Sequence, residues 1–94
     1  MFSLKDIAKE LAINEDTLVK EAIKAYIERK LLEVDSEILK IREKYSIKDI
    51  YDMNKKIEEG YLDESCIEDF FKLDRLELKK EKLEKILRKL QSSG

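Results

Sequence analysis

Hydrophobic residues recur at steps of three and four along nearly the whole chain, which is the spacing of amphipathic helices. The longest such run covers residues 16–45, which contain neither Gly nor Pro to interrupt a helix. Its apolar stripe consists of Val19, Ala22, Ile23, Tyr26, Ile27, Leu31, Val34, Ile38, Ile41 and Tyr45. This spacing is typical of a coiled-coil seam, so it predicts one long helix with a single apolar edge.

Three capping boxes, each a Ser followed three residues later by an acid, divide the rest of the chain: Ser3 with Asp6, Ser46 with Asp49, and Ser65 with Glu68. They predict helices over residues 4–12, 47–59 and 66–90. Asn14 is expected to cap the long helix, and Gly60 to end the third in a left-handed conformation. The expected fold class is all-α, with helices in the order short, long, short, long.

The long helix exceeds the size of a compact chain of 94 residues. It would reach about 45 Å at about 1.5 Å per residue, whereas a compact chain of this length has a radius of gyration near ~12 Å. The last helix, the same helix of a second copy, or both must cover its stripe, unless a bend near residues 35–36 gives a compact monomer. We expect a homodimeric helical bundle with a coiled-coil-like seam. The expected dimer-interface residues are Val19, Ile23, Tyr26, Ile27, Leu31, Val34, Ile38 and Ile41.

Composition excludes several chemistries. The chain has no His, one Cys and two Gly, so it lacks Ser-His and Cys-His pairs, His-ligated zinc, cysteine metal clusters and a glycine-rich phosphate loop. The carboxylates lie among lysines on predicted outer faces, which is typical of surface ion pairs rather than of general acids. We therefore expect no catalytic residue, no cofactor, no metal and no enzymatic activity.

The expected location is the cytoplasm. Cys66 is the single cysteine, which suits a reducing compartment, and we interpret it as a small, half-buried apolar residue. The sequence contains no apolar run of about 18 residues for a membrane span, and its first residues do not resemble a secretory signal. A composition rich in Lys, Glu and Ile, with only two Asn, is typical of hyperthermophile proteins.

Charge is unevenly distributed, although the chain as a whole carries a net charge of −2. Residues 1–30 have six bases and six acids, residues 46–71 have three bases against eight acids, and residues 72–94 have eight bases against four acids. The acidic and basic regions are either solvated helix faces or two partner surfaces of opposite sign. Acids interleave with the bases of the last helix, which favours a solvated face there.

Aromatic and leucine side chains of the second half are candidate anchors for a partner protein, because aromatic residues dominate interface energetics. Tyr61 falls in the predicted loop, and Phe71 is not required by the apolar stripe of the last helix, in which Lys80 replaces an apolar residue. The candidate partner-binding residues are Tyr61, Phe71, Leu76, Leu83 and Leu87.

Residues 4–31, LKDIAKELAINEDTLVKEAIKAYIERKL, resemble two groups of DNA-binding proteins. The first ten resemble the opening of a bacterial helix-turn-helix, and INEDTLVKEAIKAYIERKL is similar to the second helix of ribbon-helix-helix repressors and antitoxins, which forms their dimer core. The sequence departs from these families because it has no room for an N-terminal strand. Ala12 stands where a helix-turn-helix usually has Gly, Glu21 stands where an apolar residue is usual, and the acids at 15–16 would face DNA phosphates.

The rest of the chain has an acidic capped helix that ends at Gly60 and a charged last helix that ends in Leu83, Ile86, Leu87 and Leu90. In this outline it resembles small archaeal antitoxin-type proteins. That resemblance implies a helix-turn-helix-like dimerising part at 1–45 and a toxin-holding part of the same domain at 46–91, and we expect a disordered tail at 92–94. The expected function is a non-enzymatic, antitoxin-like regulator that binds a toxin protein. The alternatives are a structural helical homo-oligomer and a weak DNA-binding transcriptional regulator. For the latter, the candidate nucleic-acid contacts are Lys5, Lys9, Lys20 and Lys24, together with the basic last helix.

Overall fold

The computed structural model describes residues 3–92, and it contains helices joined by short turns. The elements are α1 (Leu4–Glu10), α2 (Glu15–Tyr45), α3 (Ile50–Glu58), a 3₁₀ turn η1 (Glu64–Cys66) and α4 (Ile67–Ser92). Residues 3–92 include no strand. The all-α class and the short, long, short, long order of the helices are therefore confirmed.

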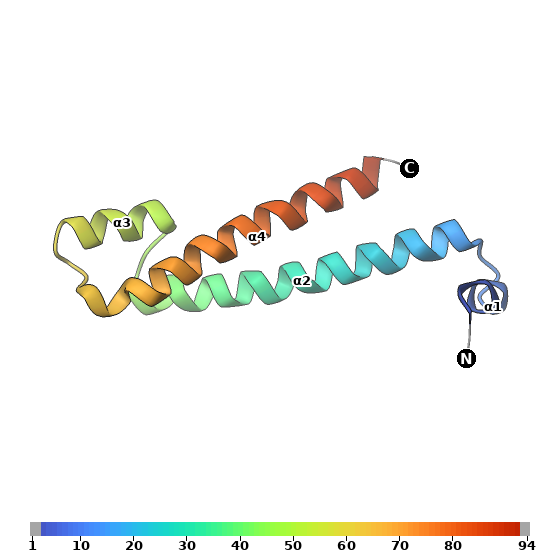
Figure 1. The fold of residues 1–94 in the computed structure, drawn as a ribbon, viewed down its shortest axis with the longest axis horizontal. Helices are drawn as coiled ribbons and strands as arrows, with labels where there is room; N and C mark the ends of the chain where they lie inside the picture. The colour runs from blue at the N-terminus through green and yellow to red at the C-terminus, as the bar shows by residue number, and fades with distance from the viewer. Residues whose placement is uncertain (1–2, 93–94) are drawn as a thin grey trace.

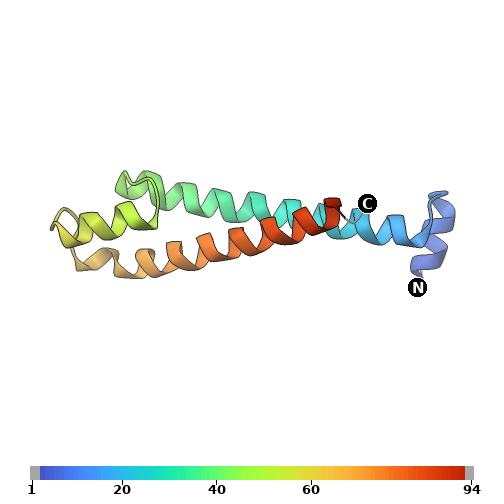
Figure 2. The same cartoon turned by 90° about the horizontal axis from the view of Figure 1, so that it is seen from above.

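Helices α2 and α4 run antiparallel along the length of the molecule, and α3 packs at the end where they are joined (Figures 1 and 2). Near that end Tyr45 contacts Asp69, and farther along Asp35 contacts Lys80. Helix α2 continues unbroken past the end of α4, and α1 lies beyond it (Figure 1). The molecule measures 60 × 29 × 16 Å, and its radius of gyration of 19.1 Å exceeds the compact value of about 12 Å. The long uninterrupted helix is confirmed, and the alternative of a compact monomer is not.

Two of the predicted caps are present. The backbone N–H of Asp6 donates to Ser3 Oγ at 3.2 Å, and the N–H of Ser3 donates to Asp6 Oδ2 at 3.4 Å, which completes the first capping box. Asn14 Oδ1 accepts from the N–H of Thr17 at 2.7 Å at the start of α2. Gly60 has a φ of 82°, so the left-handed conformation predicted after the third helix is also confirmed.

The other two Ser caps are wrong. Ser46 adopts a left-handed conformation that ends α2, and Asp49 caps α3 by accepting from the N–H of Asp52 at 2.8 Å. The residues between Ser46 and Asp49 are not helical, because the chain turns there to bury Ile47 in the core. Asp63 caps η1 by accepting from the N–H of Ser65 at 2.8 Å, so α4 begins later than predicted.

The remaining end points also differ from those predicted. Helix α1 ends at Glu10, and Ala12 has a φ of 57°, which no right-handed helix contains. Helix α4 continues to Ser92, so this residue is helical rather than part of the expected tail. The other two residues of that tail, 93–94, lie outside the described residues.

One continuous core joins α2, α3, η1 and α4 within a single chain. Met53, Cys66 and Leu73 are its most deeply buried side chains, so Cys66 is fully buried rather than half-buried. The whole cluster consists of Ile27, Val34, Ile38, Ile41, Ile47, Met53, Cys66, Leu73, Leu76 and Leu83. We call residues 27–92 the bundle.

This core corrects the expected interfaces. Helix α4 of the same chain covers four of the residues assigned to a seam between copies, Ile27, Val34, Ile38 and Ile41. Leu31, assigned to the same seam, is half-buried against this core. Leu76 and Leu83, assigned to partner binding, are buried in the same core. An antiparallel helix within one chain presents the same apolar partner as a helix of a second chain, so the pattern alone cannot distinguish the two.

Candidate interaction surfaces

Residues 3–26, which we call the N-terminal arm, have almost no core of their own. Ala8 is the only buried residue among them, and it lies between α1 and α2. Helix α1 has seven residues, too few to be stable in water without packing. Six large apolar side chains of the arm are exposed: Leu4, Ile7, Leu11, Val19, Ile23 and Tyr26.

Three of these exposed residues share one edge of α2. Val19, Ile23 and Tyr26 follow each other at steps of four and three residues, so they form a continuous apolar edge, which we call the arm edge. The predicted stripe continues from it into the core, but Ile23 is 40% exposed whereas Val34 is 2% exposed. The side chain of Lys30 lies over the Tyr26 ring, 5.6 Å from its centroid.

A second apolar surface lies on the side of α4 that faces away from the core. Ile67, Phe71 and Leu78 follow each other at steps of four and seven residues, and Tyr51 of α3 is exposed nearby. The Phe71 ring is 53% exposed and packs edge-on against Phe70, with 5.6 Å between ring centroids. We call these four residues the outer face.

The outer face adjoins an acidic hollow of about 210 Å³ between α3 and α4. It is lined by Ile50, Tyr51, Asp74, Glu77, Leu78 and Glu81. Burial raises the pKa of Glu77, and the negative charges of Asp49 and Asp74 add to that increase. The hollow therefore combines apolar walls with carboxylates. A cationic side chain placed in it would stabilise the ionised form of Glu77.

Three polar contacts join α4 to α2. The hydroxyl of Tyr45 donates to Asp69 Oδ2 at 2.5 Å, and Lys44 Nζ lies 2.9 Å from the same oxygen. The hydrogen bond from Tyr45, followed by that from Lys44, lowers the pKa of Asp69. Lys80 Nζ lies 2.8 Å from Asp35 Oδ1, which explains why a lysine occupies the apolar stripe of the last helix.

The predicted partner-binding residues are divided between surface and core. Tyr61, in the turn after α3, and Phe71 are exposed as expected, whereas Leu87 is half-buried against the core. The sequence pattern does not indicate Tyr51, Ile67 or Leu78. The seven-residue step from Phe71 to Leu78 was the available signal, but it runs beside the stronger core stripe of the same helix.

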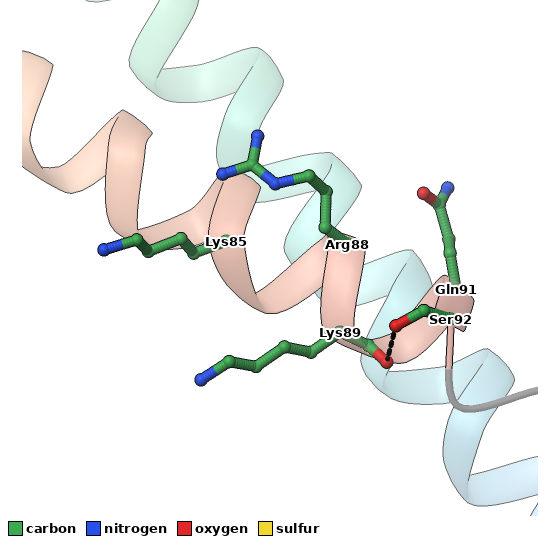
Figure 3. Close-up of a pocket in the computed structure, with 5 residues that line it drawn as sticks. All are labelled: Lys85, Arg88, Lys89, Gln91 and Ser92. Carbon is green, nitrogen blue, oxygen red and sulfur yellow. Dashed lines mark hydrogen bonds between the residues drawn. The ribbon is translucent and has the colours of Figure 1, made fainter.

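The C-terminal part of α4 forms a basic surface. Lys85, Arg88 and Lys89 line an open hollow of about 580 Å³ with Gln91 and Ser92 (Figure 3). Lys85 and Lys89 extend to the same side of the helix, and Arg88 points away from them (Figure 3). None of these three bases makes an ion pair with another residue in the range 3–92.

The predicted nucleic-acid contacts fall in two places. Lys20 and Lys24 line a hollow of about 260 Å³ with Leu90 and Gln91, so they lie beside the basic end of α4. Lys24 also forms an exposed ion pair with Glu28 at 3.9 Å. Lys5 and Lys9 are exposed on α1, beyond the end of α4. The structure therefore brings together only one of the two lysine pairs with the basic helix.

Within the described chain, no group of three His, Cys, Asp or Glu side chains is placed to hold a metal ion. None of the helices in residues 3–92 is long and apolar enough to cross a membrane.

Comparison with known proteins identifies a family. The model of the family described as "Uncharacterized protein MJ0235 family" matches residues 1–94, so the chain belongs to that family. No curated protein and no solved structure matches the chain.

Proposed function

We propose that this member of the MJ0235 family is a non-enzymatic, antitoxin-like interaction protein. Its N-terminal arm pairs with a second copy, and its outer face holds a basic partner protein. The observation that carries the proposal is that two separate apolar surfaces, the arm edge and the outer face, stay exposed on a chain whose bundle has already closed its own core. Exposed apolar patches of this kind mark protein interaction sites.

The outer face has the composition of a binding surface for a basic partner. Phe71 and Tyr51 offer aromatic anchors, which contribute most to interface energies. The carboxylates of Asp74, Glu77 and Glu81 line the hollow beside them. An arginine or lysine entering the hollow would pack its aliphatic stem on Leu78 and place its charge among these carboxylates.

The antitoxin-like role follows from the resemblance of the sequence to small archaeal antitoxins. Under that role the partner is a toxin, and the acidic stretch of residues 46–71 suits a basic, RNA-cleaving one. We place the protein in the cytoplasm, where the thiol of Cys66, buried and unpaired, stays reduced.

A matched pair of variants tests partner binding. The tagged full-length chain would be recovered from cells of its native source as wild type, as Phe71→Glu and as Leu39→Glu. Leu39 is the control, because it lies on α2 and is 52% exposed, close to the 53% of Phe71. Circular dichroism would show that all three variants are equally helical.

We expect the wild type and Leu39→Glu to retain a basic protein that Phe71→Glu loses, and added salt to weaken its retention. Recovery of the same proteins by all three variants, or of no basic protein by any, would contradict the proposal.

A second candidate function, nucleic-acid binding, is favoured by the basic surface. Residues 82–92 carry four bases against one acid, and α4 brings them beside residues 20–30, which carry four bases against two acids. Joint replacement of Lys85, Arg88 and Lys89 by Ala should abolish a gel shift of duplex DNA, whereas Lys5→Ala with Lys9→Ala should not. Such binding should weaken steeply with salt. No shift by the wild type at low salt would exclude this candidate.

A further inference from the structure

We propose that two copies pair through the arm edge with their α2 helices antiparallel and the two-fold axis beside Ala22 and Ile23. This inference rests on the self-association in the proposed function, and it adds the orientation and the register. The occupant of the arm edge is thus a second copy of this chain.

Among residues 3–92, no element covers the arm edge. Helix α4 covers Ile27, but it ends at Ser92 beside Lys20 and Lys24, so Val19, Ile23 and Tyr26 stay exposed. Residues 1–30 have equal numbers of acids and bases. Two such segments can therefore approach each other without net repulsion.

The charges on either side of the arm edge determine the orientation. Glu15 and Asp16 lie before the apolar edge, and Arg29 and Lys30 lie after it. An antiparallel pairing about Ala22 and Ile23 places residues equidistant from the axis side by side. The facing pairs are then Glu15 with Lys30, Asp16 with Arg29, Val19 with Tyr26, and Ala22 with Ile23.

The two charged pairs that flank the apolar edge in this register are attractive, because both acids of one end meet both bases of the other. Ala22, at the axis, is small and permits close approach of the two backbones. The existing ion pair of Lys30 with Glu33 at 3.2 Å is exposed. Exchanging it for a pair between copies therefore costs little.

A parallel pairing has the opposite electrostatics. It would place the acids of residues 15–16 against the same acids of the other copy, and the bases of residues 29–30 against the same bases. It would also align the two helix dipoles, whereas antiparallel helices place opposite partial charges together.

The first part of the test measures association. Sedimentation velocity of the full chain over micromolar to millimolar concentrations gives the dimer dissociation constant. Ile23→Glu should raise that constant at least about a hundredfold, because it places two carboxylates beside the axis. Leu39→Glu, on an exposed position of the same helix, should leave it within about threefold. Equal constants for the two variants would overturn the proposal.

The second part measures orientation by disulfide formation. Ala22→Cys should cross-link two copies on mild oxidation, because the axis brings these residues within reach. Glu15→Cys should not, because the introduced thiol of each copy faces Lys30 of the other and lies fifteen positions, about 22 Å along the helix, from the matching thiol. The native thiol of Cys66 is buried and the wild type serves as the blank.

The outcomes separate this inference from the proposed function. Cross-linking of Ala22→Cys alone supports the antiparallel pairing. Cross-linking of both variants shows a parallel dimer, which overturns the orientation and leaves the self-association intact. A dimer in which Ala22→Cys does not cross-link overturns the arm edge as the interface, and a monomer at every concentration overturns the self-association as well.

A charge exchange completes the test. Changing Glu15 and Asp16 to Lys, or Arg29 and Lys30 to Glu, should each raise the dissociation constant about tenfold, because both ends then repel. A mixture of the two variants should recover the wild-type affinity as a heterodimer, in which every facing pair is again attractive. If each variant alone dimerises as well as the wild type, the register is wrong.

Discussion

The bundle and the N-terminal arm are built from the same sequence pattern, but only the bundle buries it. Val34 and Ile23 lie along one apolar stripe of α2, and they differ in exposure because α4 faces the first and leaves the second largely open. Burial therefore depends on the length of the facing helix rather than on the stripe itself. The difference separates a part that closes its own core from a part that offers a surface.

The largest expected difference between the two regions is in stability. Leu73→Ala should lower the free energy of unfolding by about 2–5 kcal/mol, because Leu73 is completely buried and its truncation leaves a cavity. Ile23→Ala should lower it by less than about 1 kcal/mol in the monomer. Urea denaturation followed by circular dichroism at low protein concentration measures both. Equal losses would mean that the arm is as well packed as the bundle.

A substitution at Ala8 should detach α1 without affecting the bundle. Ala8 is 3% exposed and fills the junction of α1 with α2, so Ala8→Glu places a charge where no room exists. We expect hydrogen exchange of residues 4–10 to approach the rate of an unfolded chain, while exchange of residues 27–92 is unchanged. Faster exchange throughout the chain would show that α1 supports the bundle.

The sequence predicted much of the fold because each helix has a local signal. The stripe of α2, the cap at Asn14 and the turn at Gly60 all act over a few residues. The error at Ser46 arose because burial of Ile47 outweighs a local capping preference. Long-range packing, which a single sequence does not show, decided that turn.

The interaction surfaces were harder to predict than the fold. Val19, Ile23 and Tyr26 are exposed, as the predicted interface requires, but Ile27, Val34, Ile38 and Ile41, assigned to the same interface, are buried within the chain. The pattern does not reveal where α4 ends. Phe71 was identified by its place outside the core stripe, whereas Tyr51 comes from a different helix, and its proximity to Leu78 exists only in the folded chain.

A smaller effect concerns the junction of α2 with α4. Tyr45→Phe should lower the stability of the bundle by about 1 kcal/mol, because Asp69 loses its hydrogen bond from the hydroxyl. The lowered pKa of Asp69 means that its contribution is present above the ordinary value of 3.8 and is lost as pH falls through the lowered value. The raised pKa of Tyr45 means that its contribution is present below 10.0 and is lost as pH rises through the raised value.

Urea denaturation of Tyr45→Phe and wild type across this pH range measures the effect. The stability difference should be greatest at neutral pH and should decrease toward both extremes. A difference independent of pH would assign the loss to packing of the ring rather than to the pair with Asp69.

The smallest effect is expected for the ion pair of Asp35 with Lys80. Both side chains are more than a third exposed, so a double-mutant cycle with Ala at each position should give a coupling of roughly 0.2–1 kcal/mol. Lys80→Met should leave stability nearly unchanged, because its apolar side chain continues the stripe of α4. A coupling of several kcal/mol would show that this pair, rather than the core, holds the two helices together.

The most direct test of the pairing of the N-terminal arm is sedimentation velocity of the full chain as its concentration rises. We predict that the measured mass increases from 11.2 kDa to twice that value, and that Ile23→Glu alone prevents the increase while Leu39→Glu does not. A mass of 11.2 kDa for the wild type at every concentration would contradict the account.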